Sequence, residues 1–135
     1  NMQKKEAYII QETKKNKRDI TIISTGSEVS IAIEAKKILE KKSLNVTVVS
    51  MPCWEIFDKT SDTYKNKILG PIKKRIAIEA ALKYGWTKYI LNEEHMLGMS
   101  SFGASAPAEI LYNNFGLNAK ELVKLALRIY KKSNG

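Results

Sequence analysis

The sequence predicts one α/β domain with three layers, in which a mostly parallel sheet of about five strands, one of them antiparallel, is flanked by helices. Two short apolar runs rich in β-branched residues, at 19–24 and 45–50, are typical of parallel strands buried on both faces. The stretch between them has the apolar period of a helix packed on a sheet. Strand, helix and strand form a βαβ unit, and a length of 135 residues suits a single domain.

The first half of the chain supplies this unit and an edge strand. We expect a short edge strand at 7–12 (AYIIQE), before the strand at 19–24 (DITIIS). The helix should run from Glu28 to about Lys42, with Ser27 as its cap and the Glu28 charge at its positive end. Its apolar half comprises Val29, Ile31, Ala32, Ala35, Ile38 and Leu39, and its polar half Ser30, Glu34, Lys37 and Lys41.

The middle of the chain contains two more strand patterns. We expect a short helix at 62–69, a strand at 75–80 (RIAIEA) and a further strand at 87–91 (TKYIL). Residues 92–104 are rich in small side chains and are interpreted as a loop. With the edge strand, these patterns give the five strands of the predicted sheet.

Two helices are expected toward the C-terminal end. Ser105, with Pro107 in the first turn, should start a helix that ends before Gly116. Asn118 and Glu121 form a capping pair for the last helix. Its apolar stripe is Ala119, Leu122, Val123, Ala126, Ile129 and Tyr130, opposite Lys120, Lys124, Arg128 and Lys131.

The net charge of +9 does not indicate nucleic-acid binding. Residues 1–18 hold six basic and two acidic groups, and residues 120–135 hold five and one, so the central part is almost neutral. Recognition of nucleic acid needs basic groups gathered on one surface, preferably arginines, and the three arginines are far apart in sequence. The aromatic residues are interpreted as packing groups rather than as base-stacking platforms: Trp54, Phe57, Tyr64, Tyr84, Trp86 and Tyr89.

Other features of the composition indicate a cytoplasmic protein without a membrane partner. No apolar run approaches the roughly 20 residues that cross a bilayer, and the start of the chain is polar. The single cysteine, Cys53, cannot form an internal disulfide. Because the chain starts with asparagine, we expect it to be a piece of a longer polypeptide.

The turn STGSEV is the best candidate for a binding site. It follows a predicted buried strand and opens a helix, where free N–H groups attract anions. The candidate anion site is formed by Gly26, Ser27, Glu28 and Val29. The turn lacks the three-glycine dinucleotide fingerprint and the lysine of a P-loop, so a well-capped turn with no ligand is the favoured interpretation and the anion site is the alternative.

The remaining reactive residues form no catalytic constellation. His95 is interpreted as an exposed loop histidine rather than a metal ligand, and Cys53 as a buried, unreactive thiol. Glu79 lies in an apolar strand, so it has either a buried partner or a place at the carboxyl end of the strand, where α/β ligand sites occur. Asp58 and Glu79 could act as an acid–base pair, but their spacing does not indicate that they meet.

Several motifs occur together in one order: TGSEV at 25–29, VVSMP at 48–52, FDK at 57–59 with Tyr64, RIAIEA at 75–80, GM at 98–99, FGASAP at 102–107 and FG at 115–116. From about Ala7 to Tyr130, the chain resembles the carboxyl-terminal domain of transketolase. The combination of the MP, FDK and Tyr64 segment with FGASAP is specific to this family, whereas TGSEV also occurs in related thiamine-diphosphate enzymes. The segment 92–97 departs from the family pattern, so the resemblance assigns no role to His95.

The resemblance implies a piece of a larger enzyme. Transketolases move a two-carbon ketol unit between sugar phosphates in the pentose phosphate pathway, with thiamine diphosphate and Mg²⁺ or Ca²⁺. They are homodimers whose active sites are built from the two upstream domains, so no catalytic, cofactor-binding or metal residue is assigned to this chain. Residues 1–18 would be the remainder of the interdomain connection, and residues 19–135 the carboxyl-terminal domain.

In such an enzyme this domain would contribute by packing on the upstream domains and on the second subunit. Isolating it should therefore expose an apolar surface. The candidates for that surface are Met96, Leu97, Met99, Phe102, Trp54 and Phe57. Full burial of these side chains within the single chain would contradict the idea.

Overall fold

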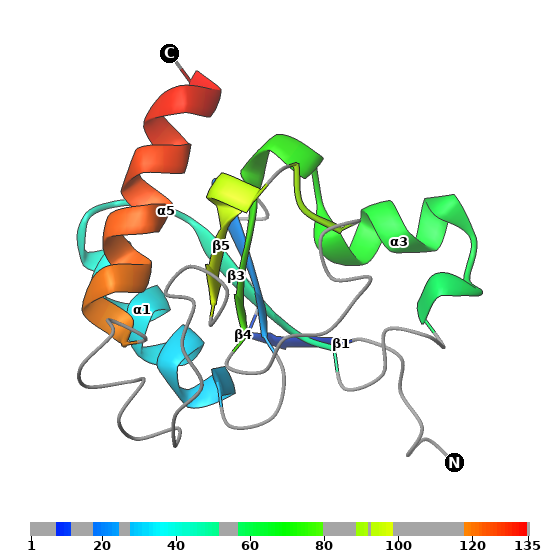
Figure 1. Ribbon diagram of the computed structural model, residues 1–135, viewed down its shortest axis with the longest axis horizontal. Coiled ribbons are helices and arrows are strands. Elements are labelled where there is room, and N and C mark those ends of the chain that lie inside the picture. The colour runs from blue at the N-terminus through cyan, green and yellow to red at the C-terminus, as the bar shows by residue number, and fades with distance from the viewer. Residues whose placement is uncertain are drawn as a thin grey trace.

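The computed structural model describes residues 8–11, 18–24, 28–51, 57–79, 89–91, 93–98 and 118–134. The strands are β1 (Tyr8–Gln11), β2 (Ile20–Ser24), β3 (Val46–Ser50), β4 (Arg75–Glu79) and β5 (Met96–Gly98). The helices are α1 (Val29–Lys41), α3 (Asp62–Leu69) and α5 (Ala119–Asn134), with two 3-10 helices at Ile72–Lys74 and Glu93–His95 (Figure 1).

The five strands form one sheet in the order β1-β3-β2-β4-β5. β2, β3, β4 and β5 run parallel to one another, and β1 pairs antiparallel with β3. Ile22, in the centre of β2, lies between Val48 of β3 and Ile76 of β4. The predicted mostly parallel sheet with one antiparallel strand is therefore confirmed. β1 lies inside the 1–18 segment, so part of that segment also belongs to the sheet.

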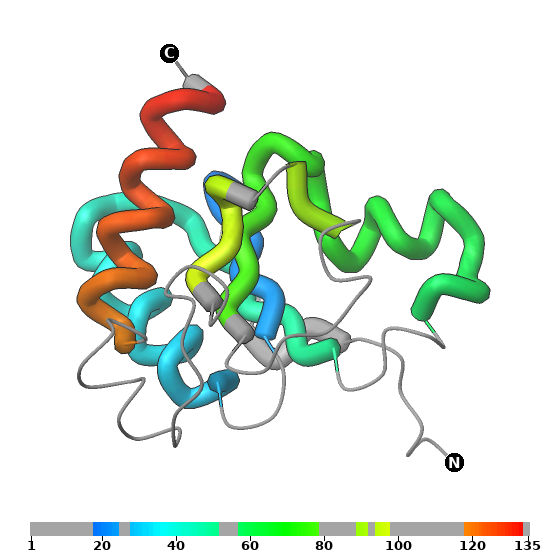
Figure 2. Tube along the Cα trace, viewed as in Figure 1, coloured from blue at the N-terminus to red at the C-terminus, as the bar shows by residue number. Residues whose placement is uncertain are grey.

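Helices cover both faces of the sheet, which gives the predicted three layers (Figure 1). Because side chains alternate along a strand, Ile22 belongs to the core beneath α1 and α5, whereas Ile23 belongs to the core on the α3 side. Every residue of β2 and β3 is buried, as expected for strands covered on both faces. The tube in Figure 2 follows α1 and α5 side by side on one face, with α3 on the other.

The helix patterns are confirmed where the structure describes them. α3 has the predicted bounds, and α1 and α5 bury the apolar stripes expected of them. Asn118 caps α5, because its Oδ1 accepts a hydrogen bond from the Glu121 N–H at 2.9 Å. The cap of α1 falls on Glu28, one residue later than expected, and the Glu28 side chain makes no capping hydrogen bond. Both Ser27 and the predicted helix 105–115 lie outside the described residues.

The last strand of the sheet lies elsewhere than predicted. Residues 89–91 are not a strand, and β5 is formed by Met96–Gly98, within the expected loop 92–104. Tyr89 and Ile90 are buried in the core on the α3 side, so their apolar character serves packing beneath the sheet. β5 has three residues and none of them is β-branched, so the sequence carries almost no strand signal there.

Candidate functional site

The predicted anion turn lies at the carboxyl end of β2. The structure describes Glu28 and Val29, whereas Gly26 and Ser27 lie outside the described residues. Glu28 is 5% exposed and occupies the N-cap position of α1. Its side chain makes no capping hydrogen bond, but a carboxylate this close to the turn would oppose a bound anion, because like charges repel. The anion site stays a prediction.

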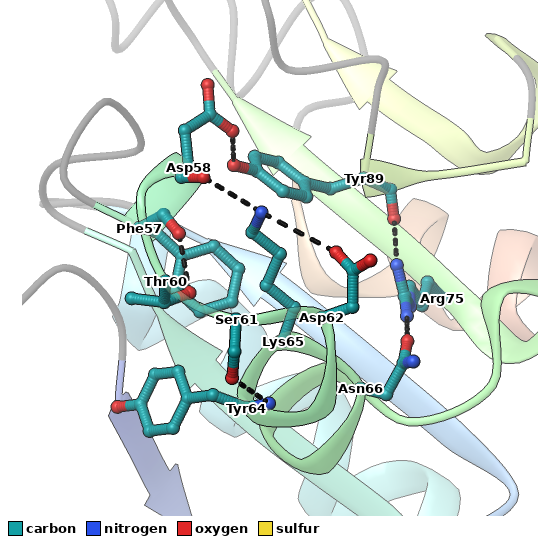
Figure 3. Close-up of polar contacts among 10 residues, drawn as sticks. All are labelled: Phe57, Asp58, Thr60, Ser61, Asp62, Tyr64, Lys65, Asn66, Arg75 and Tyr89. Carbon is teal, nitrogen blue, oxygen red and sulfur yellow. Dashed lines mark hydrogen bonds and ion pairs between the residues drawn. The ribbon is translucent and has the colours of Figure 1, made fainter.

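Phe57 is fully buried in the core on the α3 side, and Figure 3 labels it together with Tyr64 and Tyr89. Its ring centroid lies 5.3 Å from that of Tyr89, in an edge-on arrangement, and 6.1 Å from that of Tyr64. Such geometry is typical of aromatic packing in a core. The interpretation of these three aromatic residues as packing groups is confirmed.

The prediction of an exposed apolar surface is wrong for Phe57, whereas Met96 and Leu97 keep part of their surface exposed. Phe57 is completely buried, and Met96 and Leu97 are half-buried and pack against the core. The cause is β5, since it brings this segment into the sheet beside β4. Trp54, Met99 and Phe102 lie outside the described residues. In the described part of the chain, the exposed large apolar side chains are Ile72 (40%) and Leu91 (49%).

Asp58 has a partner that the sequence did not indicate (Figure 3). The Tyr89 hydroxyl donates a hydrogen bond to the Asp58 carboxylate. Burial of Tyr89 raises its pKa, and the bond to Asp58 and the Asp58 charge raise it further. Lys65 donates to the Asp58 carbonyl oxygen at 2.8 Å.

Glu79 is the last residue of β4, so it lies at the carboxyl end of the strand, as one of its two interpretations predicted. Its side chain lies outside what the structure describes.

Arg75 holds together the segments around the start of β4 (Figure 3). Its Nε and Nη2 donate to the Gly70 carbonyl oxygen at 2.9 and 2.7 Å, and its Nη1 donates to the Tyr89 carbonyl oxygen at 3.2 Å. Nη2 also donates to the Asn66 amide oxygen at 3.2 Å. Burial, followed by the charge of Arg18, lowers the pKa of Arg75. All three acceptors are neutral and belong to the fold, so this cation has a structural role.

His95 is buried, so its interpretation as an exposed loop residue is wrong. It is 3% exposed, because the chain enters β5 directly after it and pairs with β4. Its Nδ1 lies 2.8 Å from the Arg75 carbonyl oxygen. A carbonyl oxygen can only accept a hydrogen bond, so Nδ1 carries the proton and donates it. Among the residues that the structure describes, no group of three acidic, histidine or cysteine side chains could hold a metal ion.

A pocket of about 220 Å³ lies beside His95. Its lining comes from three segments that are far apart in sequence: Lys73, Leu91, His95, Ile129, Lys132 and Ser133. At its rim, Lys132 and Glu94 form an ion pair of 2.6 Å, and the bond from Lys132 lowers the pKa of Glu94. Sequence reasoning missed this pocket because no local motif connects the three segments.

The chain matches the family described as transketolase-like TK C-terminal domain over residues 7–118. It belongs to that family. The resemblance of the motifs to transketolase is thereby confirmed, and with it the α/β fold class.

Curated transketolases are similar over most of this chain. It is 42% identical to the transketolase of Bacillus subtilis over 129 residues, which are 95% of the chain and 19% of the relative. It is 45% identical to chloroplastic transketolase-1 of Arabidopsis thaliana over 112 residues, which are 82% of the chain and 15% of the relative. The chain therefore spans about a fifth of the length of the transferases that it matches.

Solved transketolase structures are also similar to this chain. The transketolase of Leishmania mexicana superposes with a TM-score of 0.78 at 40% identity, covering 94% of this chain and 18% of that one. A transketolase of Pichia stipitis in complex with sedoheptulose-7-phosphate gives a TM-score of 0.80 at 32% identity, covering 97% and 19%. No helix in the described part of this chain combines the length and apolar character that crossing a membrane requires.

Proposed function

We propose that this chain works as the carboxyl-terminal domain of a transketolase and contributes to interdomain and dimer packing, without supplying a catalytic residue. The observation that carries the proposal is the coverage, 95% of this chain against 19% of the Bacillus subtilis enzyme. The assembled homodimer would transfer a two-carbon ketol unit between sugar phosphates. Thiamine diphosphate and Mg²⁺ or Ca²⁺ would be bound by the upstream domains, in the cytoplasm.

The polar interior of the described residues supports a structural role. Arg75 directs its N–H groups to two carbonyl oxygens and one amide of its own domain. The hydroxyl of the buried Tyr89 donates to Asp58. Catalytic acids and bases have to reach a reacting atom of the substrate. These side chains instead make hydrogen bonds within the domain itself.

The exposed surface supports packing that is largely polar. Ile72 and Leu91 are the large apolar side chains that the described residues expose, and single exposed apolar groups of this kind are ordinary. Contacts between domains of one chain are more polar than those of obligate dimers. The described surface therefore suits a domain that rests against neighbours through mixed contacts.

A chimera tests the proposal. This chain would replace the matching segment of the Bacillus subtilis transketolase, and the enzyme lacking that segment would be the control. We expect a dimer with turnover within about tenfold of the parent, since all reacting groups remain in place. A folded, dimeric chimera that loses more than about a hundredfold of its turnover would contradict a purely structural role. Thiamine diphosphate and Mg²⁺ titrated into the 135-residue chain alone should give no saturable heat.

The alternative function, an anion-binding module at Gly26, Ser27, Glu28 and Val29, has its own test. Free N–H groups at the start of α1 would attract phosphate, whereas the Glu28 carboxylate would oppose it. Phosphate binding that disappears in Gly26→Pro would support this site. Binding that is unchanged in Gly26→Pro would eliminate it.

A further inference from the structure

We propose that the pocket beside His95 binds a small hydroxylated phosphate monoester. The pocket lies between the 3-10 helix Ile72–Lys74, the residues before β5 and the C-terminal end of α5. These elements meet at the end of the sheet where β4 and β5 begin, opposite the start of α1 (Figure 1). The inference goes beyond the proposed function, because it assigns a ligand site that needs no other domain.

Two ammonium groups supply the attraction for a phosphate. Lys73 is exposed, and its ammonium group has no hydrogen bond or ion pair with any residue of the described chain. Lys132 pairs with Glu94, but both side chains are more than half exposed, and exposed ion pairs are weak. Lys132 can therefore share its N–H groups with a second anion. Charge-assisted hydrogen bonds to phosphate oxygens are stronger than neutral ones.

The imidazole of His95 supplies a hydrogen-bond acceptor. Its Nδ1 proton is donated to the Arg75 carbonyl oxygen, so in the neutral tautomer with this bond Nε2 is the nitrogen that carries the lone pair. Nε2 makes no hydrogen bond with the described residues. Among those residues, the fully buried side-chain polar atom without a hydrogen bond is Thr47 Oγ1, so Nε2 is not fully buried. Nε2 must then reach open space. Because His95 is 97% buried and lines the pocket, that space is the pocket.

The rest of the lining sets the size and the character of the ligand. Leu91 and Ile129 offer apolar contact for a short carbon skeleton, and the Ser133 hydroxyl already donates to the Tyr130 carbonyl oxygen, which leaves its oxygen as an acceptor. A volume of about 220 Å³ is below the range of drug-sized sites, so the ligand has only a few carbon atoms. Two cations beside two acceptors fit one molecule that carries a phosphate and hydroxyl donors.

Titration of the full 135-residue chain with glycerol 3-phosphate and, separately, with inorganic phosphate tests the proposal by isothermal calorimetry and ¹⁵N shifts. We expect glycerol 3-phosphate to bind more tightly than inorganic phosphate. Lys73→Ala should weaken both ligands by about tenfold, the loss of one charge-assisted bond. Lys124→Ala is the matched control, because Lys124 is an exposed lysine of α5 that pairs with Glu121 away from the pocket, and it should change neither.

Two further variants separate the parts of the site. His95→Asn keeps an N–H for the Arg75 carbonyl oxygen but removes Nε2, so it should abolish the preference for glycerol 3-phosphate while inorganic phosphate binds as before. Glu94→Gln frees Lys132 and should tighten both ligands. Equal affinities in the wild type and Lys73→Ala, a preference that survives in His95→Asn, or a folded chain that binds neither ligand would overturn the proposal.

Discussion

The Nδ1 of His95 donates a hydrogen bond of 2.8 Å to the carbonyl oxygen of Arg75. The bond joins the residue before β5 to the first residue of β4, just ahead of the register pair Ala77 and Met96. A three-residue strand gains little stability from its own ladder, so this side-chain bond fixes where β5 begins.

His95→Ala should destabilise the fold by about 1–3 kcal/mol, because it removes the buried hydrogen bond from the imidazole to the Arg75 carbonyl oxygen. Urea unfolding measures the change. His95→Asn places an amide N–H where it can replace Nδ1 as the donor to the Arg75 carbonyl oxygen, so it should lose less stability. Equal losses in the two variants would show that the bond to Arg75 does not matter for stability.

Ionisation of Tyr89 should lower the free energy of unfolding at alkaline pH. Its folded pKa is raised by burial and by Asp58, so its contribution is complete below the unfolded value of about 10 and is lost as the pH rises through the folded pKa. Tyr89→Phe should be less stable at pH 8, where the hydroxyl bond is missing. Between pH 10 and 11 the free energy of unfolding should fall more steeply for the wild type. Parallel curves for both proteins would contradict this assignment.

Gly70→Ala should be destabilising by about 1–3 kcal/mol. Gly70 has a φ of +71°, which favours glycine, and a Cβ there would lie 2.9 Å from Cδ of Arg18. Thr63→Ala, at an exposed position in α3, is the control and should stay within about 0.5 kcal/mol of the wild type. Thermal unfolding compares the two, and similar midpoints would argue against strain at Gly70.

Asn118→Ala should cost about 1 kcal/mol, because the Glu121 N–H at the start of α5 loses its acceptor. Asn118→Asp should retain the cap and add a favourable charge at the positive helix end. Urea midpoints order the three proteins. An alanine variant as stable as the wild type would mean that packing alone fixes this helix end.

Local patterns in the sequence predict most of the fold. The runs at β2 and β3 are apolar because both faces of the sheet are covered, and Asn118 is recognisable because a cap acts within one helical turn. The anion site at the turn after β2 depends on the same kind of local signal, and it stays a prediction. Each of these signals depends on neighbours within a few positions.

Features set by contacts between distant segments escaped prediction. β5 exists because Leu97 finds Ile78 of β4, and the burial of His95 follows from that pairing. Lys36 of α1 is 5% exposed, since its ammonium group donates to the Val46 carbonyl oxygen at 2.9 Å. The residues next to Leu97 and Lys36 in the sequence do not indicate these partners. The pocket, drawn from three segments, escaped for the same reason.

Arg75 links two stretches of chain that also pack against each other in the core on the α3 side. Its guanidinium grips the carbonyl oxygen of Gly70 just after α3 and that of Tyr89, nineteen positions later in the sequence. When one stretch unfolds locally, the guanidinium loses hydrogen-bond acceptors that no other group in the buried interior replaces. Amide hydrogen exchange at the end of α3 and around Tyr89 should therefore proceed through one shared opening event rather than two.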